Sequence, residues 1–269
     1  MFSYLQAGIV VAATLLTPPS VEPKEYPALW QNTGEGRTYV LYRKFQSTAM
    51  SQGQVGSCVG CAFAKAMHML DGKDYSVEWV YGKSRDYFGK TYGAGSQCGW
   101  ACQMAQDIGL IEAKRYAILG FDLSSYDPAL AYSWERGPPE ILEWSAAKNR
   151  TRGFVRITTW EQLRDAIATG HPVVVGSRVG FGSRTNAVRT RDGMLRSRWY
   201  SRWSHAMVIC GVSDGKSKRA LLLNSWGTNW IRGPKWLGDE PDGSFWISKR
   251  DAEKILSYGD SYAVLPVVK

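Results

Sequence analysis

The pattern of apolar residues changes once along this chain, near Gly170, and this change constrains the fold more than any other feature. Before it, helical spacing and helix-end signals mark residues 57–70, 76–87, 98–108 and 159–169. After it come short β-branched, aliphatic and aromatic runs, separated by Gly, Asp and Ser, at residues 173–175, 206–212, 220–224, 244–247 and 261–265. Helices followed by strands predict an α+β fold, with a helical lobe, an antiparallel sheet lobe and room for a cleft between them.

The helix ends carry recognisable signals. Residues 57–70 are rich in Ala, Met and Cys and close at Asp71-Gly72, which predicts a buried helix. We expect the helix at 76–87 to be partly exposed. Gly109 ends the third helix, and Thr158 or Thr159 caps the fourth, which Gly170 stops.

Length and composition bound the class of protein. The 269 residues fit one large domain or two packed lobes. An apolar fraction of 44% with 21% charged residues excludes a disordered chain and a coiled coil. The mean hydropathy of −0.28 excludes a polytopic membrane protein.

The first 27 residues differ from the rest. Residues 1–16 are uncharged and mostly apolar, but this run is short for a span of about 20 residues and lacks the positive start of a signal peptide. It is either a signal or anchor, which would bring the chain to a membrane, or a segment that packs on protein. Residues 18–27 read as an extended linker. We expect a globular unit at 28–269, with the helical lobe at about 50–130 and the sheet lobe at about 150–269.

The positive charge is concentrated in one stretch. The chain has a formal net charge of +9, and residues 178–202 hold seven arginines against Asp192 alone. This insert is either a solvated basic loop or a surface that receives an acidic partner or acidic peptide. Because the charge does not follow predicted helices, no nucleic-acid partner is expected.

Five cysteines are too few for a disulfide scaffold. Cys58 and Cys61, with Cys98 and Cys102, have spacings near those of zinc ligands, so a zinc-binding module is one alternative. Against it, three of these four lie within predicted helices. We expect Cys61, Cys98, Cys102 and Cys210 to be packed thiols, and His68 and His171 to have no chemical role.

Four residues have the types and order needed for acyl transfer by a thiol. Cys58 starts a predicted helix, where the free N–H groups favour a thiolate. Gln52 lies in a glycine-rich turn six residues earlier and offers an amide donor for an oxyanion. His205 opens a strand and Asn224 ends the next, so antiparallel pairing would bring the Asn224 amide oxygen to the imidazole.

These motifs resemble the papain family of cysteine peptidases. The resemblance is carried by Gln52-Gly53, Gly56-Ser57-Cys58, Ser204-His205-Ala206 and Asn224-Ser225-Trp226-Gly227 with Trp230, and it covers roughly residues 50–265. It implies a two-lobed papain-like fold and a cysteine endopeptidase that needs no cofactor or metal. Cys58 would be the nucleophile, His205 the general base and acid, Asn224 its orienting partner and Gln52 an oxyanion donor.

The resemblance also implies substrate contacts. Gly95-Ser96 aligns with the paired glycines that bind the substrate backbone upstream of the scissile bond. Ala206 would face the pocket for the second substrate side chain. Trp226 would cover the His205–Asn224 hydrogen bond and belongs to the same substrate-binding set.

The departures from the family pattern are informative. Val55 and Gly93 stand where secreted members place a disulfide, and Val59 replaces a bulky aromatic residue. The joint loss of both cysteines fits the disulfide-poor bacterial and viral members and a reduced compartment, cytoplasmic or virion-associated, rather than secretion. Two inserts, 178–202 and 231–242, should border the cleft.

Two further alternatives stay open. One keeps the papain-like scaffold but uses it for binding or structure without catalysis. The other keeps the thioester chemistry but transfers the acyl group to an amine, because hydrolysis and transamidation share the acyl-enzyme.

Overall fold

The computed structural model describes residues 19–31, 36–46, 49–90, 92–178, 180–181, 187–196, 199–200 and 204–268. The apolar run at residues 1–16 lies outside these ranges. The described α-helices are α1 (Cys58–Asp71), α2 (Val77–Tyr87), α3 (Cys98–Asp107), α4 (Pro128–Ser133), α5 (Glu143–Ala146), α6 (Trp160–Ala168) and α7 (Lys249–Leu256). Short 3₁₀ helices lie at Ala28–Trp30, Ala117–Leu119, Trp134–Arg136, Glu140–Leu142 and Ala147–Asn149.

One antiparallel sheet organises the second lobe. Its main path runs β12–β10–β9–β5–β13–β4, and β1 pairs with the far end of β9. These strands are β1 (Thr38–Val40), β4 (Phe154–Arg156), β5 (Val173–Ser177), β9 (His205–Ser213), β10 (Arg219–Leu223), β12 (Ser244–Ser248) and β13 (Asp260–Val264). Short pairs complete the described strands: β2 (Arg115–Tyr116) with β3 (Phe121–Asp122), β6 (Gly180–Phe181) with β8 (Trp199–Tyr200), and β7 (Ala187–Val188) with β11 (Ile231–Arg232).

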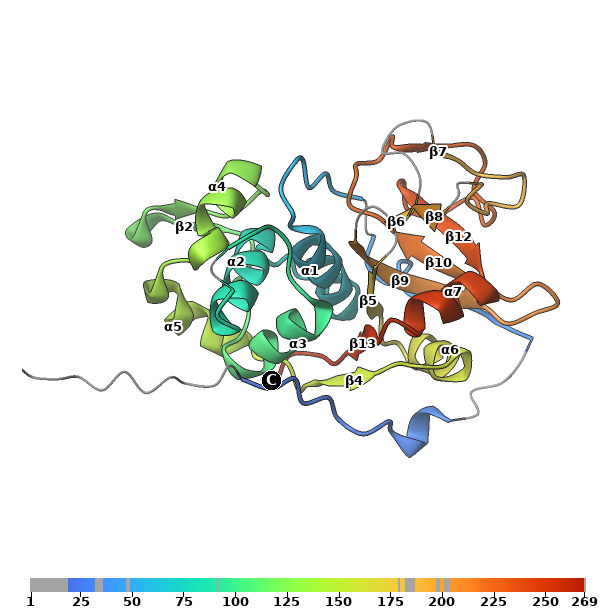
Figure 1. Ribbon diagram of the computed structural model, residues 1–269, viewed down its shortest axis with the longest axis horizontal. Helices are drawn as coiled ribbons and strands as arrows, with labels where there is room; N and C mark the ends of the chain where they lie inside the picture. Colours follow the sequence, from blue (N-terminus) through green and yellow to red (C-terminus); the bar gives the residue numbers. More distant parts are fainter. Residues whose placement is uncertain are drawn as a thin grey trace, which may run out of the picture.

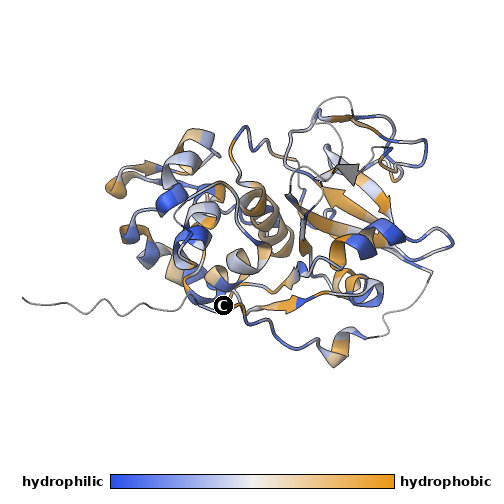
Figure 2. Cartoon of the chain, viewed as in Figure 1, coloured by the Kyte–Doolittle hydropathy of each residue, from blue (hydrophilic) through white to orange (hydrophobic). Residues whose placement is uncertain are grey.

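The two lobes lie side by side, with α1 between the other helices of its lobe and the sheet (Figure 1). Alternate residues of each strand bury opposite faces. Val174, Val208 and Leu221 join the core with α1 and α3, whereas Val173, Ile209 and Leu222 join the core with α6 and α7. Figure 2 shows hydrophobic residues along the central strands. The sheet is covered on both faces, which explains why its strands read as unbroken apolar runs.

The expected helices form with ends close to those predicted. Gly72 takes a left-handed conformation (φ 79°) at the end of α1, as the Asp71-Gly72 signal indicated. The Ser76 and Thr159 side chains cap α2 and α6 by accepting the backbone N–H groups of Trp79 and Gln162. The expectation of a partly exposed second helix is wrong, because α2 is buried from Val77 to Arg85 between α1, α3 and α4.

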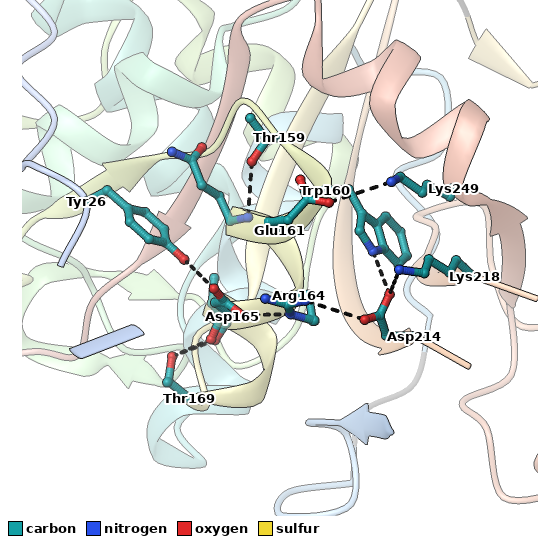
Figure 3. A network of polar contacts seen from close by, with 12 residues as sticks. Tyr26, Thr159, Trp160, Glu161, Arg164, Asp165, Thr169, Asp214, Lys218 and Lys249 are labelled. Carbon is teal, nitrogen blue, oxygen red and sulfur yellow. Dashed lines mark hydrogen bonds and ion pairs between the residues drawn. The ribbon is translucent and has the colours of Figure 1, made fainter. Parts of the chain in front are cut away.

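A buried polar network fixes α6 to the sheet lobe (Figure 3). Asp214, which follows β9, accepts hydrogen bonds from Trp160 Nε1 (2.8 Å) and pairs with Lys218 Nζ (3.0 Å). Arg164 lies between Asp214 and Asp165, with its Nε 2.7 Å from Asp165 Oδ1. Each aspartate of this network therefore has a cation beside it: Asp165 pairs with Arg164, and Asp214 pairs with Arg164 and Lys218. Such pairing offsets the cost of burying a charge.

Candidate active site

The loop before Cys58 is fastened to the sheet lobe. Ser51 forms an antiparallel bridge with Trp226, and the Gln52 N–H donates to the Ser225 carbonyl over 2.9 Å. A Cβ on Gly56 would lie 2.8 Å from the Gly95 nitrogen, so only glycine fits where the loop passes the 93–96 segment. These contacts bring the amino end of α1 to the boundary between the lobes.

Cys58 forms no disulfide and is a half-buried thiol at the first position of α1. Ser57, the residue before it, makes no side-chain cap to the helix; its hydroxyl instead lies 2.7 Å from the Tyr126 hydroxyl. The amino end of α1 therefore carries no side-chain cap of its own, and such N–H groups favour negative charge.

His205 and Asn224 form the pair that antiparallel pairing predicted. β9 and β10 are neighbours, and His205 Nε2 lies 2.7 Å from Asn224 Oδ1 with both side chains buried. Asn224 Oδ1 also accepts the Ser225 backbone N–H over 2.7 Å, which fixes the orientation of the amide. Since an amide oxygen only accepts, His205 Nε2 carries the hydrogen and Nδ1 is the nitrogen left to exchange a proton.

Trp226 lies against the imidazole. Its ring centroid is 4.7 Å from that of His205, with 30° between the planes, and Trp230 packs edge-on against Trp226 at 5.1 Å. Trp226 does not line the cleft described below. Its position is that of a cover on His205 rather than of a substrate contact.

Gln52 is buried, with 3% of its surface exposed. Its Oε1 accepts the Ser225 hydroxyl over 2.6 Å, and its Nε2 donates one hydrogen to the Val55 carbonyl over 2.9 Å. An amide nitrogen has two hydrogens, so one remains for a further acceptor. Gln52 itself does not line the cleft.

Cys58 and His205 line one cleft of about 550 Å³, although they come from different lobes. Gly95, Ser96 and Ala206 line the same space, so it contains three of the four substrate-binding residues that the sequence predicted. The other two catalytic candidates, Gln52 and Asn224, do not line it, and Asn224 is joined to it through His205.

A buried arginine holds the Gly95-Ser96 segment in place. Arg85 has no exposed surface and donates to the carbonyls of Gly93 and Gly95, both over 2.6 Å. The Gly95 N–H donates to the Tyr81 hydroxyl at 3.2 Å. Within the described chain, the Ser96 backbone N–H and C=O have no protein partner.

Sequence reasoning missed several residues of this cleft. Val21 and Pro23 come from the expected linker, Arg156 from β4, and Asp260 and Tyr262 from β13. No motif marks them. Only the register of the sheet, in which Asp260 pairs with Gly176 and Gly176 with Ala206, brings them to one face.

The other four cysteines are buried and free. Burial raises the pKa of the Cys61, Cys98, Cys102 and Cys210 thiols, which keeps them protonated at neutral pH. Among the described residues, no three His, Cys, Asp or Glu side chains lie together as a metal site would require. Cys58, Cys61, Cys98 and Cys102 therefore do not form the zinc site that their spacing offered as an alternative.

The two inserts pair with each other rather than bordering the cleft together. β11 at 231–232 runs parallel to β7 at 187–188, and Arg189 is a buried tie that donates to the carbonyls of Ser244 and Gly233. Of the described residues at 178–202, Arg178 alone lines the cleft, and residues 231–242 contribute nothing to it. The expectation that both inserts border the cleft is wrong for the second one.

No helix in the described ranges is both long and apolar enough to cross a membrane.

Comparison with known proteins rests on structure alone. No family model and no curated protein sequence matches the chain. Xylellain, a cysteine protease from Xylella fastidiosa, is similar at 18% identity and a TM-score of 0.64, over 92% of this chain and 91% of that one. Digestive procathepsin L 3 from Tenebrio molitor larval midgut has 15% identity and a TM-score of 0.57, covering 90% and 73%. The Carica candamarcensis cysteine protease CMS1MS2 has 18% identity and a TM-score of 0.52, covering 85% and 98%. This chain therefore has the fold of papain-like cysteine proteases.

Proposed function

We propose that this protein is a cysteine endopeptidase that cleaves peptide bonds through a thioester on Cys58. One observation carries the proposal: the Cys58 thiol at the amino end of α1 shares a cleft with the imidazole of His205, whose Nε2 lies 2.7 Å from Asn224 Oδ1. The fold is shared with cysteine proteases at low sequence identity, so the site residues, not the likeness, carry the activity.

In the proposed reaction, His205 Nδ1 takes the proton of Cys58, and the thiolate attacks the peptide carbonyl carbon. The resulting oxyanion receives hydrogen bonds from the Cys58 N–H and from the remaining Nε2 hydrogen of Gln52. The tetrahedral intermediate then collapses: the C–N bond breaks, His205 protonates the leaving amine, and the acyl group remains on Cys58 as a thioester. Water, deprotonated by His205, then releases the carboxylic acid and restores the thiol.

An extended substrate would lie along Ser96. With the Gly93 and Gly95 carbonyls engaged by Arg85, the Ser96 N–H and C=O are the groups that pair with the peptide backbone. The next side chain upstream would enter the space between Ala206, Gly176 and Tyr262.

The lineage proposed for this chain is that of the disulfide-poor bacterial and viral members of the papain family. None of the five cysteines, all of them among the described residues, forms a disulfide, and positions 55 and 93 hold Val and Gly. A reduced compartment fits this thiol chemistry.

The test compares Cys58→Ala and Cys58→Ser with Cys61→Ala, which removes a buried thiol one turn further along the same helix. We expect both Cys58 variants to lose peptide cleavage by 10³-fold or more and to stop reacting with an epoxide probe. Cys61→Ala should keep both properties. Cleavage that persists in folded Cys58→Ala would rule out the proposed nucleophile.

A further inference from the structure

Two arginines line the cleft, and neither has an acidic partner among the residues that the structure describes. Arg156 ends β4 and Arg178 follows β5, and both are exposed. Within the described residues, Arg156 donates one hydrogen bond, to the Gly259 carbonyl over 2.9 Å, out of the five N–H donors of a guanidinium. Neither arginine forms an ion pair with any residue in the described part of the chain.

Arg156 and Arg178 both belong to the cleft lining near the end of the β5–β13 pair. Arg156 reaches the carbonyl of Gly259, and Tyr258 and Gly259 line the space beside it. β5 ends at Ser177 and the antiparallel β13 begins at Asp260, so Arg178 and the residues Tyr258–Gly259 lie at the same end of this strand pair. The rim at Tyr258–Gly259 therefore carries two like charges, which is unfavourable until an anion neutralises them.

Asp260 is the acidic residue of the cleft lining, and α3 already uses its carboxylate. Oδ2 accepts the Cys98 N–H over 3.0 Å and Oδ1 accepts the Gly99 N–H over 2.9 Å. Gln97, at the N-cap of α3, makes no side-chain cap, and the first turn of α3 contains no acid.

Asp260 thus serves as the cap of α3 from another lobe, and the positive end of that helix offsets its charge. Gly176 is required for this arrangement, because a Cβ there would collide with Asp260 Oδ2.

We infer that this cleft selects peptides with an acidic side chain upstream of the scissile bond, bound by Arg156 and Arg178. The inference rests on the proposed peptidase function and names its substrate class. A carboxylate can accept two parallel hydrogen bonds from one guanidinium, a geometry that neutral amides do not match. A lysine at the same substrate position would meet two like charges, while the one carboxylate near it is occupied by α3 amides.

The experiment uses matched peptides that carry Glu, Gln or Lys at the second and third positions upstream of the cleaved bond. The proteins are wild type, Arg156→Gln, Arg178→Gln and the double variant. Arg191→Gln and Arg196→Gln are controls, because these arginines are exposed but outside the cleft. We expect wild type to prefer Glu over Gln by about tenfold in kcat/KM, or about 1.4 kcal/mol. The preference should shrink with added salt and approach unity in the double variant, but persist in both controls.

Equal rates on Glu and Gln peptides, or a preference for Lys, would overturn the inference while Cys58-dependent cleavage kept the peptidase proposal standing. If the Arg191 and Arg196 variants lost the preference for Glu as fully as the Arg156 and Arg178 variants, the inference would also be overturned. The cause would then be the overall positive potential of residues 178–202. If no peptide is cleaved in a Cys58-dependent way, the peptidase proposal itself fails.

Discussion

Ser225 donates its hydroxyl hydrogen to Gln52 Oε1 over 2.6 Å, and this buried contact joins the sheet lobe to the loop that leads into Cys58. Gln52 returns a backbone hydrogen bond to the Ser225 carbonyl. Ser225, which directly follows Asn224, therefore sets the orientation of the Gln52 amide, the candidate oxyanion donor. One short segment, 224–226, contacts His205 from one side and Gln52 from the other.

A double-mutant cycle should measure this coupling. Gln52→Ala should lower kcat by 10²–10³-fold, the usual effect of losing one oxyanion donor. Ser225→Ala should lower kcat by about fivefold with little change in KM, because one buried hydrogen bond contributes about 1 kcal/mol. The double variant should lose little more than Gln52→Ala alone. Additive losses would mean that Ser225 does not act through Gln52.

Thiol reactivity should be confined to one residue. Burial raises the pKa of four cysteines, so at pH 7.5 they remain protonated and out of reach. Iodoacetamide should add one label to the folded protein, mapped to Cys58 by mass spectrometry, and five labels after unfolding. A second site labelled at a comparable rate in the native protein would contradict the burial of these thiols.

His171 should make the fold sensitive to acid. Burial lowers its pKa to about 4, and its ring lies 4.2 Å from that of Trp30. The unfolded chain, with a histidine pKa of about 6.5, takes up the proton first, so this contribution to stability is complete above pH 6.5 and is lost as the pH falls toward 4. The loss has an upper limit of about 1.4 kcal/mol per pH unit.

Urea unfolding of wild type and His171→Phe across this pH range checks this prediction. The variant keeps an aromatic ring against Trp30 but cannot bind a proton, so its stability should fall less steeply with acid. Parallel curves for wild type and His171→Phe would show that another group causes the acid sensitivity.

Arg189 should matter for stability and not for catalysis. Its guanidinium is buried and donates to two carbonyls, from Ser244 (2.8 Å) and Gly233 (2.9 Å). Arg189→Ala would leave both carbonyls short of a donor, which costs about 1–3 kcal/mol each. The free energy of unfolding should fall accordingly, while activity per folded molecule is kept. Arg191→Ala, an exposed neighbour, should change stability by less than about 0.5 kcal/mol.

Much of the fold was predictable because its signals are local. Gly72, Thr159 and Gly170 mark helix ends through their own local preferences, and β5, β9, β10, β12 and β13 follow from apolar runs. The hydrogen bond between His205 and Asn224 was also predictable, since both flank one pair of antiparallel strands.

The cleft wall was not predictable in the same way. Asp260 caps a helix 162 positions earlier in the chain, and nothing near Asp260 in sequence announces this role. Arg156 reaches the cleft because β4 pairs with β13, and Val21 reaches it because the segment around Lys24 bridges to Val155 of β4. The burial of α2 was missed for a related reason: its polar residues, such as Arg85 and Glu78, find partners inside the protein.

Val21 and Pro23 have a practical consequence for anyone who purifies this protein. Both residues form part of the cleft wall. Removal of residues 1–23 by contaminating proteases would therefore widen the cleft while leaving Cys58, His205 and Asn224 intact. A preparation with ragged amino ends would then behave as a mixture of two specificities, and its kinetics would vary from batch to batch.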